Sequence, residues 1–446
     1  MSKLVRDSVP KTLISMAVPM LAGTFALNAY NLTDTWYVSR LGTNALAAMS
    51  FTFPVIMLLG FVSRGVATGT MSLVAHALGG KKQEVAARMT THAIILITLI
   101  SVVLSSIGMM TIKPLFTRLG ASGEVLALTR GYMGIWYFGM IFLGIHMLLG
   151  DIIMGAGNTK MASLLMVSGT VLNFILDPIM IFGLLGFPKM GIRGAALATV
   201  LAEAAVMAAA LFIVHRRHRL ITRMSLTLRR ITVSWRKILR LGIPSMLSWV
   251  LMPVSAAVIV RIVAGYGHEA VAACGVAGRI EMFAFMIPMT VGMSMVPFVA
   301  QNYGAKRFDR IAAARRGTLI FALAYGLFSA VVFFLVVRHL AGLFTKDPNV
   351  ARILVKYICM TCFGYGFLEM HRYAGFCMTG LHRPMATAML NAVRMVFLLI
   401  PLAIAGSWLF GLAGVFIGRL LSDIISGIIG VAWSAKVLRV RAHGPS

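Results

Sequence analysis

Asp34 and Asp177 are two of the carboxylates that stand inside long apolar stretches of this 446-residue chain. An ionisable group at membrane depth is costly, so it needs a partner, water or a function. Tyr30 precedes Asp34 by four residues, and Asn173 precedes Asp177 by four. Residues four apart share one face of a helix. The spacing therefore predicts two helix faces that each present a carboxylate beside a neutral hydrogen-bonding group.

A third polar position lies in a later apolar stretch. Thr199 is followed one helical turn later by Glu203. At a rise of about 1.5 Å per residue, Thr199 reaches a depth comparable to that of Asp34 and Asp177. We expect Asp34, Asp177, Asn173, Thr199 and Tyr30 to form a site for a proton or a small cation, with Glu203 beside it. The residues alone leave another interpretation open, in which Asp34 is interfacial and Asp177 caps a helix before a proline.

The elements that must position these groups are membrane helices. The chain is 59% hydrophobic and only 12% charged, whereas a soluble protein is close to a quarter charged. Apolar stretches near the ~20 residues that cross a bilayer recur from end to end. The sequence predicts an all-α integral membrane protein with twelve spans, at 13–38, 47–70, 90–112, 128–150, 162–185, 192–214, 243–264, 275–300, 316–337, 353–378, 386–407 and 412–434.

The net charge of +28 would suggest nucleic acid as the partner of a soluble protein. Here the positive charges follow the loops instead. One alternate set of loops, with both termini, holds 25 of the 41 Lys and Arg residues, and the other set holds 10. Positive charge stays on the cytoplasmic side. We therefore expect a multi-pass protein of a bacterial inner membrane with both termini cytoplasmic, basic loops near anionic lipid, and no nucleic-acid partner.

The two halves of the chain resemble one another. The polar, basic stretch 215–240 separates residues 1–214 from 241–446 and has the composition of a short amphipathic surface helix. VSRLGTNALAA (38–48) aligns with VAGYGHEAVAA (263–273) at an offset of 225, which also pairs Pro19 with Pro244. Six spans per half make the repeats parallel, related by an axis along the membrane normal. A central cavity between two such lobes is the usual arrangement of a transporter.

Several segments together resemble the multidrug and toxic compound extrusion (MATE) family of twelve-helix exporters. They are DTWYVSRLGTNALAA, GAGNTKMA, LNFILDPIMIFG, GIRGAALAT, GRIEMFAFMIPMTVGMSMVPFVAQNYGA and GLHRPMA. The resemblance implies cation-coupled export of organic cations and amphiphilic drugs by alternating access. It assigns Asp34, Asn173, Asp177 and Thr199 to the cation site of the first lobe. It also matches Pro19 to a first-helix proline whose kink changes with protonation in some members.

The second half differs from that site because its charges have both signs. Glu369 and Glu281 are the carboxylates that could contribute to coupling there, since some members of the family use an acid in the tenth span. Those members also carry an acid in the seventh span, and this chain has none there. We expect mostly neutralised structural pairs, among them Arg419 with Asp423 four residues later.

Proton-coupled antiport of small organic molecules by a monomer is the function that these patterns favour, without a cofactor. Sodium coupling is the alternative, because Asn173 and Thr199 offer neutral oxygen ligands beside the carboxylates. A flippase for lipid-linked precursors is a further alternative, although such relatives usually have fourteen spans. The sequence contains no GxxxxGK[ST] loop for ATP and no DDxxD motif of a membrane prenyl transferase. A channel would not explain the repeat. For these reasons we expect neither an enzyme nor a channel.

Overall fold

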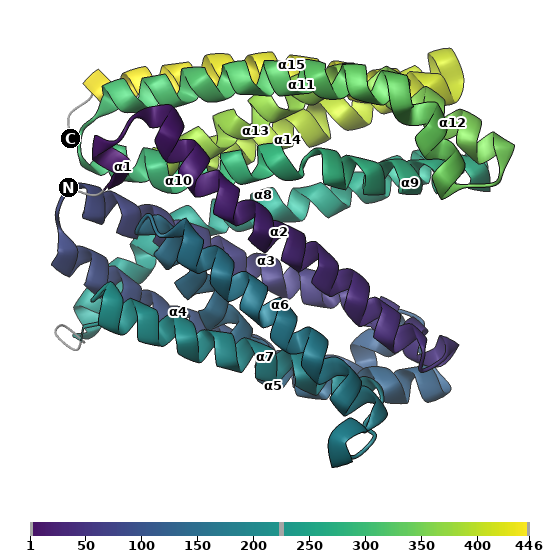
Figure 1. Cartoon of the computed structure of the whole chain (residues 1–446), viewed down its shortest axis with the longest axis horizontal. Helices are drawn as coiled ribbons and strands as arrows, with labels where there is room; N and C mark the ends of the chain where they lie inside the picture. Colours follow the sequence, from purple (N-terminus) through teal and green to yellow (C-terminus); the bar gives the residue numbers. More distant parts are fainter. Residues whose placement is uncertain (1–2, 223–226, 444–446) are drawn as a thin grey trace. The chain divides into compact units, whose positions relative to one another are not determined.

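The computed structural model describes residues 3–222 and 227–443, and every regular element there is a helix (Figure 1). In the first half the helices are α1 (Lys3–Arg6), α2 (Val9–Ser39), α3 (Thr43–Gly79), α4 (Gln83–Arg118), α5 (Gly123–Gly155), α6 (Thr159–Phe182), the short η1 (Leu184–Gly186), α7 (Ile192–Phe212) and η2 (Ile213–Arg217). In the second half they are α8 (Leu228–Ala264), α9 (His268–Ala284), α10 (Met286–Gly304), α11 (Phe308–Phe344), α12 (Pro348–Thr361), η3 (Cys362–Gly364), α13 (Tyr365–Gly380), α14 (Pro384–Ala392), η4 (Val393–Leu399) and α15 (Ile400–His443).

The helices within the described ranges supply twelve membrane crossings. Ten are long and apolar enough to cross, and α9 with α10 makes one further span that is bent by 55°. The segment Pro384–Ala442 is 59 residues long and doubles back at Gly411, where φ is 60°. Backbone atoms of Gly406 and Gly414 meet across this turn, as only an antiparallel pair of helices allows. This segment therefore crosses twice, and the number of spans agrees with the prediction.

The basic stretch 215–240 differs from the expected surface helix. Residues 223–226 of this stretch lie outside the described residues, and α8 begins at Leu228 and continues into the seventh span. Its first turns pack on α4, where Trp235 Nε1 donates to His92 O at 2.9 Å and Ser234 Oγ bonds His92 Nδ1 at 2.8 Å. These contacts hold 228–240 against α4, so the segment is the first part of α8 and not a separate helix.

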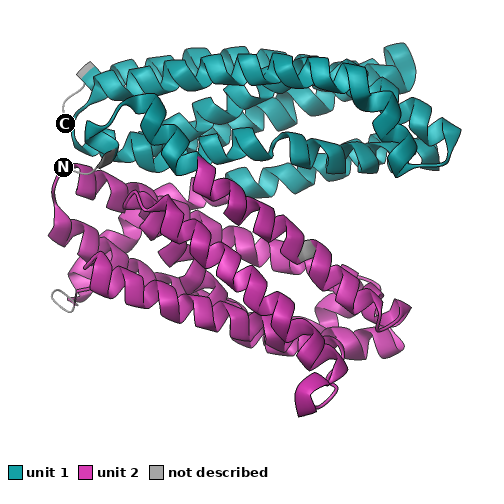
Figure 2. Ribbon diagram, viewed as in Figure 1, with its two compact units in different colours: residues 1–17, 247–446 teal, residues 18–246 magenta. Residues whose placement is uncertain are grey.

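Two compact units make up the chain, residues 18–246 and residues 1–17 with 247–446 (Figure 2). This division differs from the expected lobes because the first 17 residues group with the second half. Arg310 Nη2 donates to Leu4 O at 3.2 Å and to Asp7 O at 2.5 Å, and Asn302 Nδ2 donates to Leu4 O at 3.1 Å. These bonds attach the N-terminal segment to α10 and α11.

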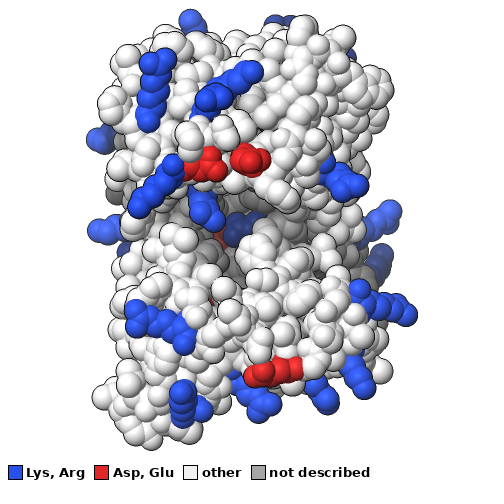
Figure 3. Space-filling view, turned by 90° about the vertical axis from the view of Figure 1, so that its right-hand side faces the viewer, with Lys and Arg blue, Asp and Glu red and all other residues white. Residues whose placement is uncertain are grey.

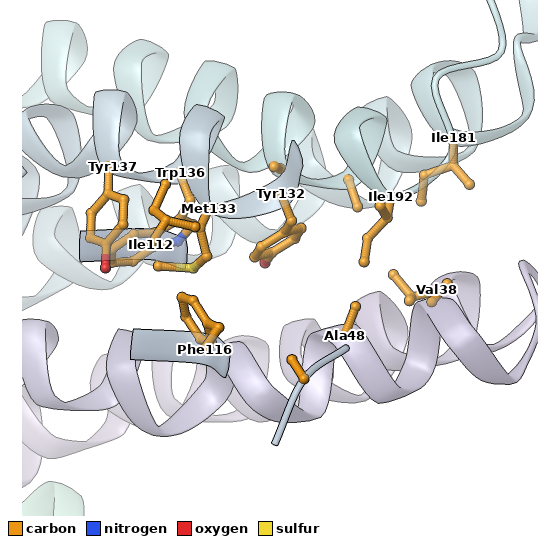
Figure 4. Close-up of a cluster of buried hydrophobic side chains, with 14 of the residues drawn as sticks. Val38, Ala48, Ile112, Phe116, Tyr132, Met133, Trp136, Tyr137, Ile181 and Ile192 are labelled. Atoms are coloured by element: carbon orange, nitrogen blue, oxygen red, sulfur yellow. The ribbon is translucent and has the colours of Figure 1, made fainter. Parts of the chain in front are cut away.

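Helix α5 lies at the centre of the unit 18–246, where it packs against α3, α4 and α7. Its Tyr132, Met133, Trp136 and Tyr137 point into a buried apolar cluster shared with α4, α6 and α7 (Figure 4). Burying such large side chains stabilises the helix packing and fixes which face of α5 looks toward α2 and α6. Helix α13 has the same central place in the other unit, against α10, α11 and α15.

Charged residues gather at the ends of the helices, and apolar side chains cover their length. Phe138, Leu335 and Trp408 are 71%, 69% and 84% exposed. On the face opposite the termini, Lys and Arg are scattered singly, with few Asp and Glu among them (Figure 3). Exposed apolar flanks with charged ends are the arrangement that a lipid bilayer requires.

Candidate functional site

Asp34 on α2 and Asp177 on α6 are both buried within the unit 18–246. Their side chains are 5% and 0% exposed, and the two carboxylates are close enough to interact electrostatically. Asp34 Oδ1 and Asp177 Oδ2 accept no hydrogen bond within the described part of the chain. Neither carboxylate forms an ion pair there with a Lys or Arg. Buried carboxylate oxygens without a partner are suited to bind a proton or a cation.

Neutral groups connect Asp177 to α7 and α2. Asn173 Nδ2 donates to Asp177 Oδ1 at 3.3 Å and to Thr199 Oγ1 at 3.4 Å. Thr199 Oγ1 bonds the Tyr30 hydroxyl at 3.1 Å. The structure thus brings the predicted residues together, with three helices contributing to one network.

A close approach of α7 to α6 places Thr199 beside Asn173. A Cβ at Gly194 would collide with Met180 O, so only glycine lets these two backbones meet. The loop before α7 also returns to α6, where Met190 N donates to Met180 O and Gly191 N to Ile181 O, both at 3.1 Å. The GIRG sequence therefore positions Thr199 through backbone packing.

Tyr132 on α5 is a neighbour of the site that the sequence did not single out. It is 4% exposed and interacts electrostatically with both Asp34 and Asp177. Its position in an aromatic run, GYMGIWYFG, gave no sign that its hydroxyl belongs to this site rather than to the apolar core.

A small cavity of about 50 Å³ adjoins the network. Tyr30, Asn173 and Thr199 line it, together with His146 on α5 and Glu203 on α7. The remaining lining residues are Leu27, Met166, Gly169, Thr170 and Ala202. Glu203 thus lies beside the site, and His146 Nδ1 bonds Glu203 Oε2 at 2.5 Å.

Pro19 lies inside α2, where its ring removes one helix hydrogen bond. The Pro19 carbonyl accepts a hydrogen bond from Ser163 Oγ on α6. Gly23, one turn later, packs closely on the same serine. These contacts tie the proline segment of α2 to the helix that carries Asp177.

The buried acids of the second half lie in the other compact unit, and each has a basic partner. Glu281 accepts from Arg419 Nη2 and from the Tyr365 hydroxyl, both at 2.9 Å. Glu369 accepts from Arg372 Nη1 at 2.5 Å. Asp423 accepts from Arg394 at 2.7 and 2.9 Å and lies 3.9 Å from Arg419 Nε. This unit thus holds charge-balanced pairs, unlike the site around Asp34.

The MatE family model matches residues 19–179 and again residues 244–405, one segment in each half. The chain belongs to the MATE family of transporters. It is therefore a multi-pass membrane transporter and not an enzyme.

Solved structures and curated proteins agree with this assignment of the transporter. The Vibrio cholerae MATE transporter VcmN in the bent form superimposes with a TM-score of 0.92, at 28% identity over 97% of this chain and 98% of that one. The chain is 32% identical to an FAD transporter of Shewanella oneidensis, over 95% of this chain and 94% of that protein. It is 27% identical to the multidrug export protein MepA of Staphylococcus saprophyticus, over 95% and 93%.

Proposed function

We propose that this transporter exports small organic molecules in exchange for protons, with Asp34 and Asp177 as the coupling groups. The observation that carries the proposal is the pair of buried carboxylates on α2 and α6, each with an oxygen that accepts no hydrogen bond in the described part of the chain. Such a pair can change its charge when a proton binds, because no neighbouring basic side chain fixes it.

The proposed cycle uses that change of charge. With the carboxylates ionised, the first-lobe site attracts a cation or keeps the lobe open to substrate. A proton entering from outside neutralises the site, removes the attraction and lets α2 bend near Pro19. The membrane potential contributes about 2.3 kcal/mol per charge per 100 mV to inward proton movement.

Two carboxylates in one buried site favour a proton over sodium, because a proton can bind to one of them without further ligands. The Asn173 amide bonds Asp177 Oδ1 at 3.3 Å and Thr199 Oγ1 at 3.4 Å. Asn173 and Thr199 also carry neutral oxygens, so sodium coupling is the alternative that the experiment below decides.

Two classes of cargo have support. The relatives named as multidrug exporters favour organic cations and amphiphilic drugs. The relative named as an FAD transporter favours a flavin dinucleotide, and it is matched over nearly its whole length. The first lobe, with its two carboxylates, fits a cationic cargo better than an anionic one.

Reconstitution into vesicles tests the coupling and the cargo together. Export of an ethidium-type dye and of FAD would be measured under an imposed pH gradient and then under an imposed sodium gradient. We expect dye export under the pH gradient alone. Export that requires sodium and persists after the pH gradient is collapsed would contradict proton coupling. Export of FAD but not of dye would assign the flavin as cargo.

A further inference from the structure

A second group of ionisable side chains lies on the same helices as the coupling site and has no role in the cycle proposed above. His146 and Asp151 are on α5, Glu203 is on α7 and Arg64 is on α3. His146 and Glu203 are in contact at 2.5 Å, and their side chains are 15% and 24% exposed. A half-buried pair of this kind is costly to hold inside a membrane protein without a function.

The cavity joins this pair to the coupling site. His146 and Glu203 line the same 50 Å³ space as Tyr30, Asn173 and Thr199. A cavity needs only about 10–15 Å³ and two to four polar partners to hold a water molecule. Water here would be within reach of Thr199 and Asn173 and of the His146–Glu203 pair, because all four line the same space.

The order of the ionisable groups along α5 and α7 gives the direction in which they lead away from the coupling site. Glu203 lies one turn beyond Thr199 on α7, about 6 Å further along the axis. Asp151 lies five residues beyond His146, close to the end of α5 at Gly155. Helices α5 and α7 run in the same sense, and α7 leads through η2 into the basic stretch after Arg217. The groups therefore continue from the coupling site toward the side that the distribution of positive charge predicts to be cytoplasmic.

We propose that the His146–Glu203 pair is a second proton-binding site, through which protons leave the coupling site toward the cytoplasm. The proposal rests on the proton coupling proposed above. One proton passes from the Asp177 carboxyl, which contacts the cavity-lining Asn173 but does not itself line the cavity, to water in the cavity and then to Glu203 or His146. One proton then leaves the pair toward the cytoplasm. No other bond forms or breaks.

The charged groups around the pair are suited to such a step. Arg64 and Asp151 act electrostatically on His146, and Tyr30 is within electrostatic range of Glu203. An imidazole can bind and release a proton, and the carboxylate that it contacts can accept one, which is what a relay between two compartments needs. Arg64 and Asp151 carry opposite charges, so the pair keeps a nearly neutral surrounding while it binds and releases protons.

Substitution of the pair tests the proposal in vesicles. We would measure pH-gradient-driven dye export and proton flux for Glu203→Gln and His146→Gln while varying the pH on the cytoplasmic side between about 6 and 8. Export by the unaltered transporter should change across this range. Both variants should lose that dependence and export about tenfold more slowly. Dye exchange without a gradient should stay close to normal, because the coupling site is intact.

His92→Gln is the matched control. His92 is another buried histidine of the same unit, and it bonds Ser234 away from the cavity. This variant should keep the pH profile of the unaltered protein. Glu203→Asp retains a carboxylate and should restore the profile in part, which a purely structural role of Glu203 would not predict. An unchanged pH profile in both Gln variants would overturn the proposal.

A measurement on the unaltered protein keeps the proposal testable if the variants do not fold. Carbodiimides react with protonated carboxyls inside membranes, and mass spectrometry locates the product. Labelling of Glu203 should rise as the pH falls, together with the change in export rate. Absence of label on Glu203 at every pH would count against the relay. If the unaltered transporter moves no protons at all, the proposed proton coupling itself is wrong. If it moves protons but Glu203 and His146 do not affect their movement, the coupling stands and only the relay is wrong.

Discussion

Asp34 and Asp177 differ from the other buried acids of the chain in what surrounds them. Glu281, Glu369 and Asp423 each meet an arginine. An arginine beside a carboxylate balances its charge, whereas Asp34 and Asp177 form no ion pair with Lys or Arg among the described residues. Among these acids, Asp34 and Asp177 are therefore the two whose charge no basic side chain balances.

Replacing Asp34 with asparagine keeps the shape of the side chain and fixes its charge at zero. We expect Asp34→Asn to fold and insert normally but to lose gradient-driven export and substrate-induced proton release. Asp177→Asn should behave in the same way. The double variant should be no worse than either single one, because the two carboxylates act as a unit. If vesicles with Asp34→Asn exported dye at the normal rate, Asp34 would be only an interfacial residue with no role in coupling.

Removing Arg419 leaves the buried carboxylate of Glu281 without its basic partner, whereas Asp423 keeps Arg394. Arg419→Met should lower the free energy of unfolding by about 3–5 kcal/mol, because an uncompensated buried charge remains. Thermal unfolding in detergent would measure the loss, and adding Glu281→Gln should recover part of it. Arg307 pairs with Asp309 on the surface, where their side chains are 45% and 63% exposed. Arg307→Met should leave the melting temperature unchanged, and an equal loss there would argue against a special role of Arg419.

Helix α2 connects the two compact units, since its first turns cluster with residues 247–446 and the rest with 18–246. Pro19 stands two residues beyond this boundary. Proline removes one hydrogen bond of the helix, so the turn at Pro19 is the weakest of α2. This weak turn lies at the place where α2 passes from one unit to the other.

Straightening α2 tests the role of that turn. In a helix interior, alanine is more favourable than proline by about 3 kcal/mol. Pro19→Ala should therefore leave stability unchanged or higher and slow export by about tenfold, because the helix bends less readily. Pro54→Ala on the exposed side of α3 is the matched control and should export normally. Equal export by both variants would show that α2 does not need to bend.

Helices α3 and α8 approach closely through glycine. A Cβ at Gly69 would lie 2.9 Å from Gly242 N and Ile238 O, and a Cβ at Gly65 would lie 2.8 Å from Gly242 O. Small residues four apart allow membrane helices to pack backbone to backbone.

Filling this contact should force the helices apart. We expect Gly69→Ala to lower the free energy of unfolding by about 1–3 kcal/mol through overpacking. A Cβ at Gly60, on the same helix, would meet no atom within 4 Å, so Gly60→Ala should be neutral or slightly stabilising. Thermal unfolding of the two variants would compare them directly, and equal stability would mean that α8 adjusts without cost.

The orientation of the whole molecule in the membrane follows from its distribution of positive charge and remains a prediction. A cysteine placed at Ser225 should react with an impermeant thiol reagent only after the cells are opened. A cysteine at Lys346, in the loop between α11 and α12, should react in intact cells. The four native cysteines lie in membrane-spanning segments, and the unaltered chain provides the background signal. Labelling of Ser225→Cys from outside intact cells would reverse the orientation.

The sequence by itself determined the class of fold and the helices that carry the proposed coupling residues. Membrane helices satisfy their own backbone hydrogen bonds, so apolar length and the positions of charges are local properties that the sequence displays. The four-residue spacing of Tyr30 and Asp34, and of Asn173 and Asp177, predicted that each pair shares a helix face, because this spacing is also a local property. The repeat at an offset of 225 residues predicted two similar halves. The family model likewise matches one segment in each half.

Only the tertiary structure decided which helices meet and which charges find partners. The expected surface helix became the start of α8, because buried contacts of Ser234 and Trp235 with His92 outweigh the pattern of its basic residues. His146 meets Glu203 across 57 positions of sequence, and Tyr132 joins the carboxylates from an aromatic run. Such contacts depend on how helix backbones approach one another, as at Gly194, and no periodicity along a single helix records that approach.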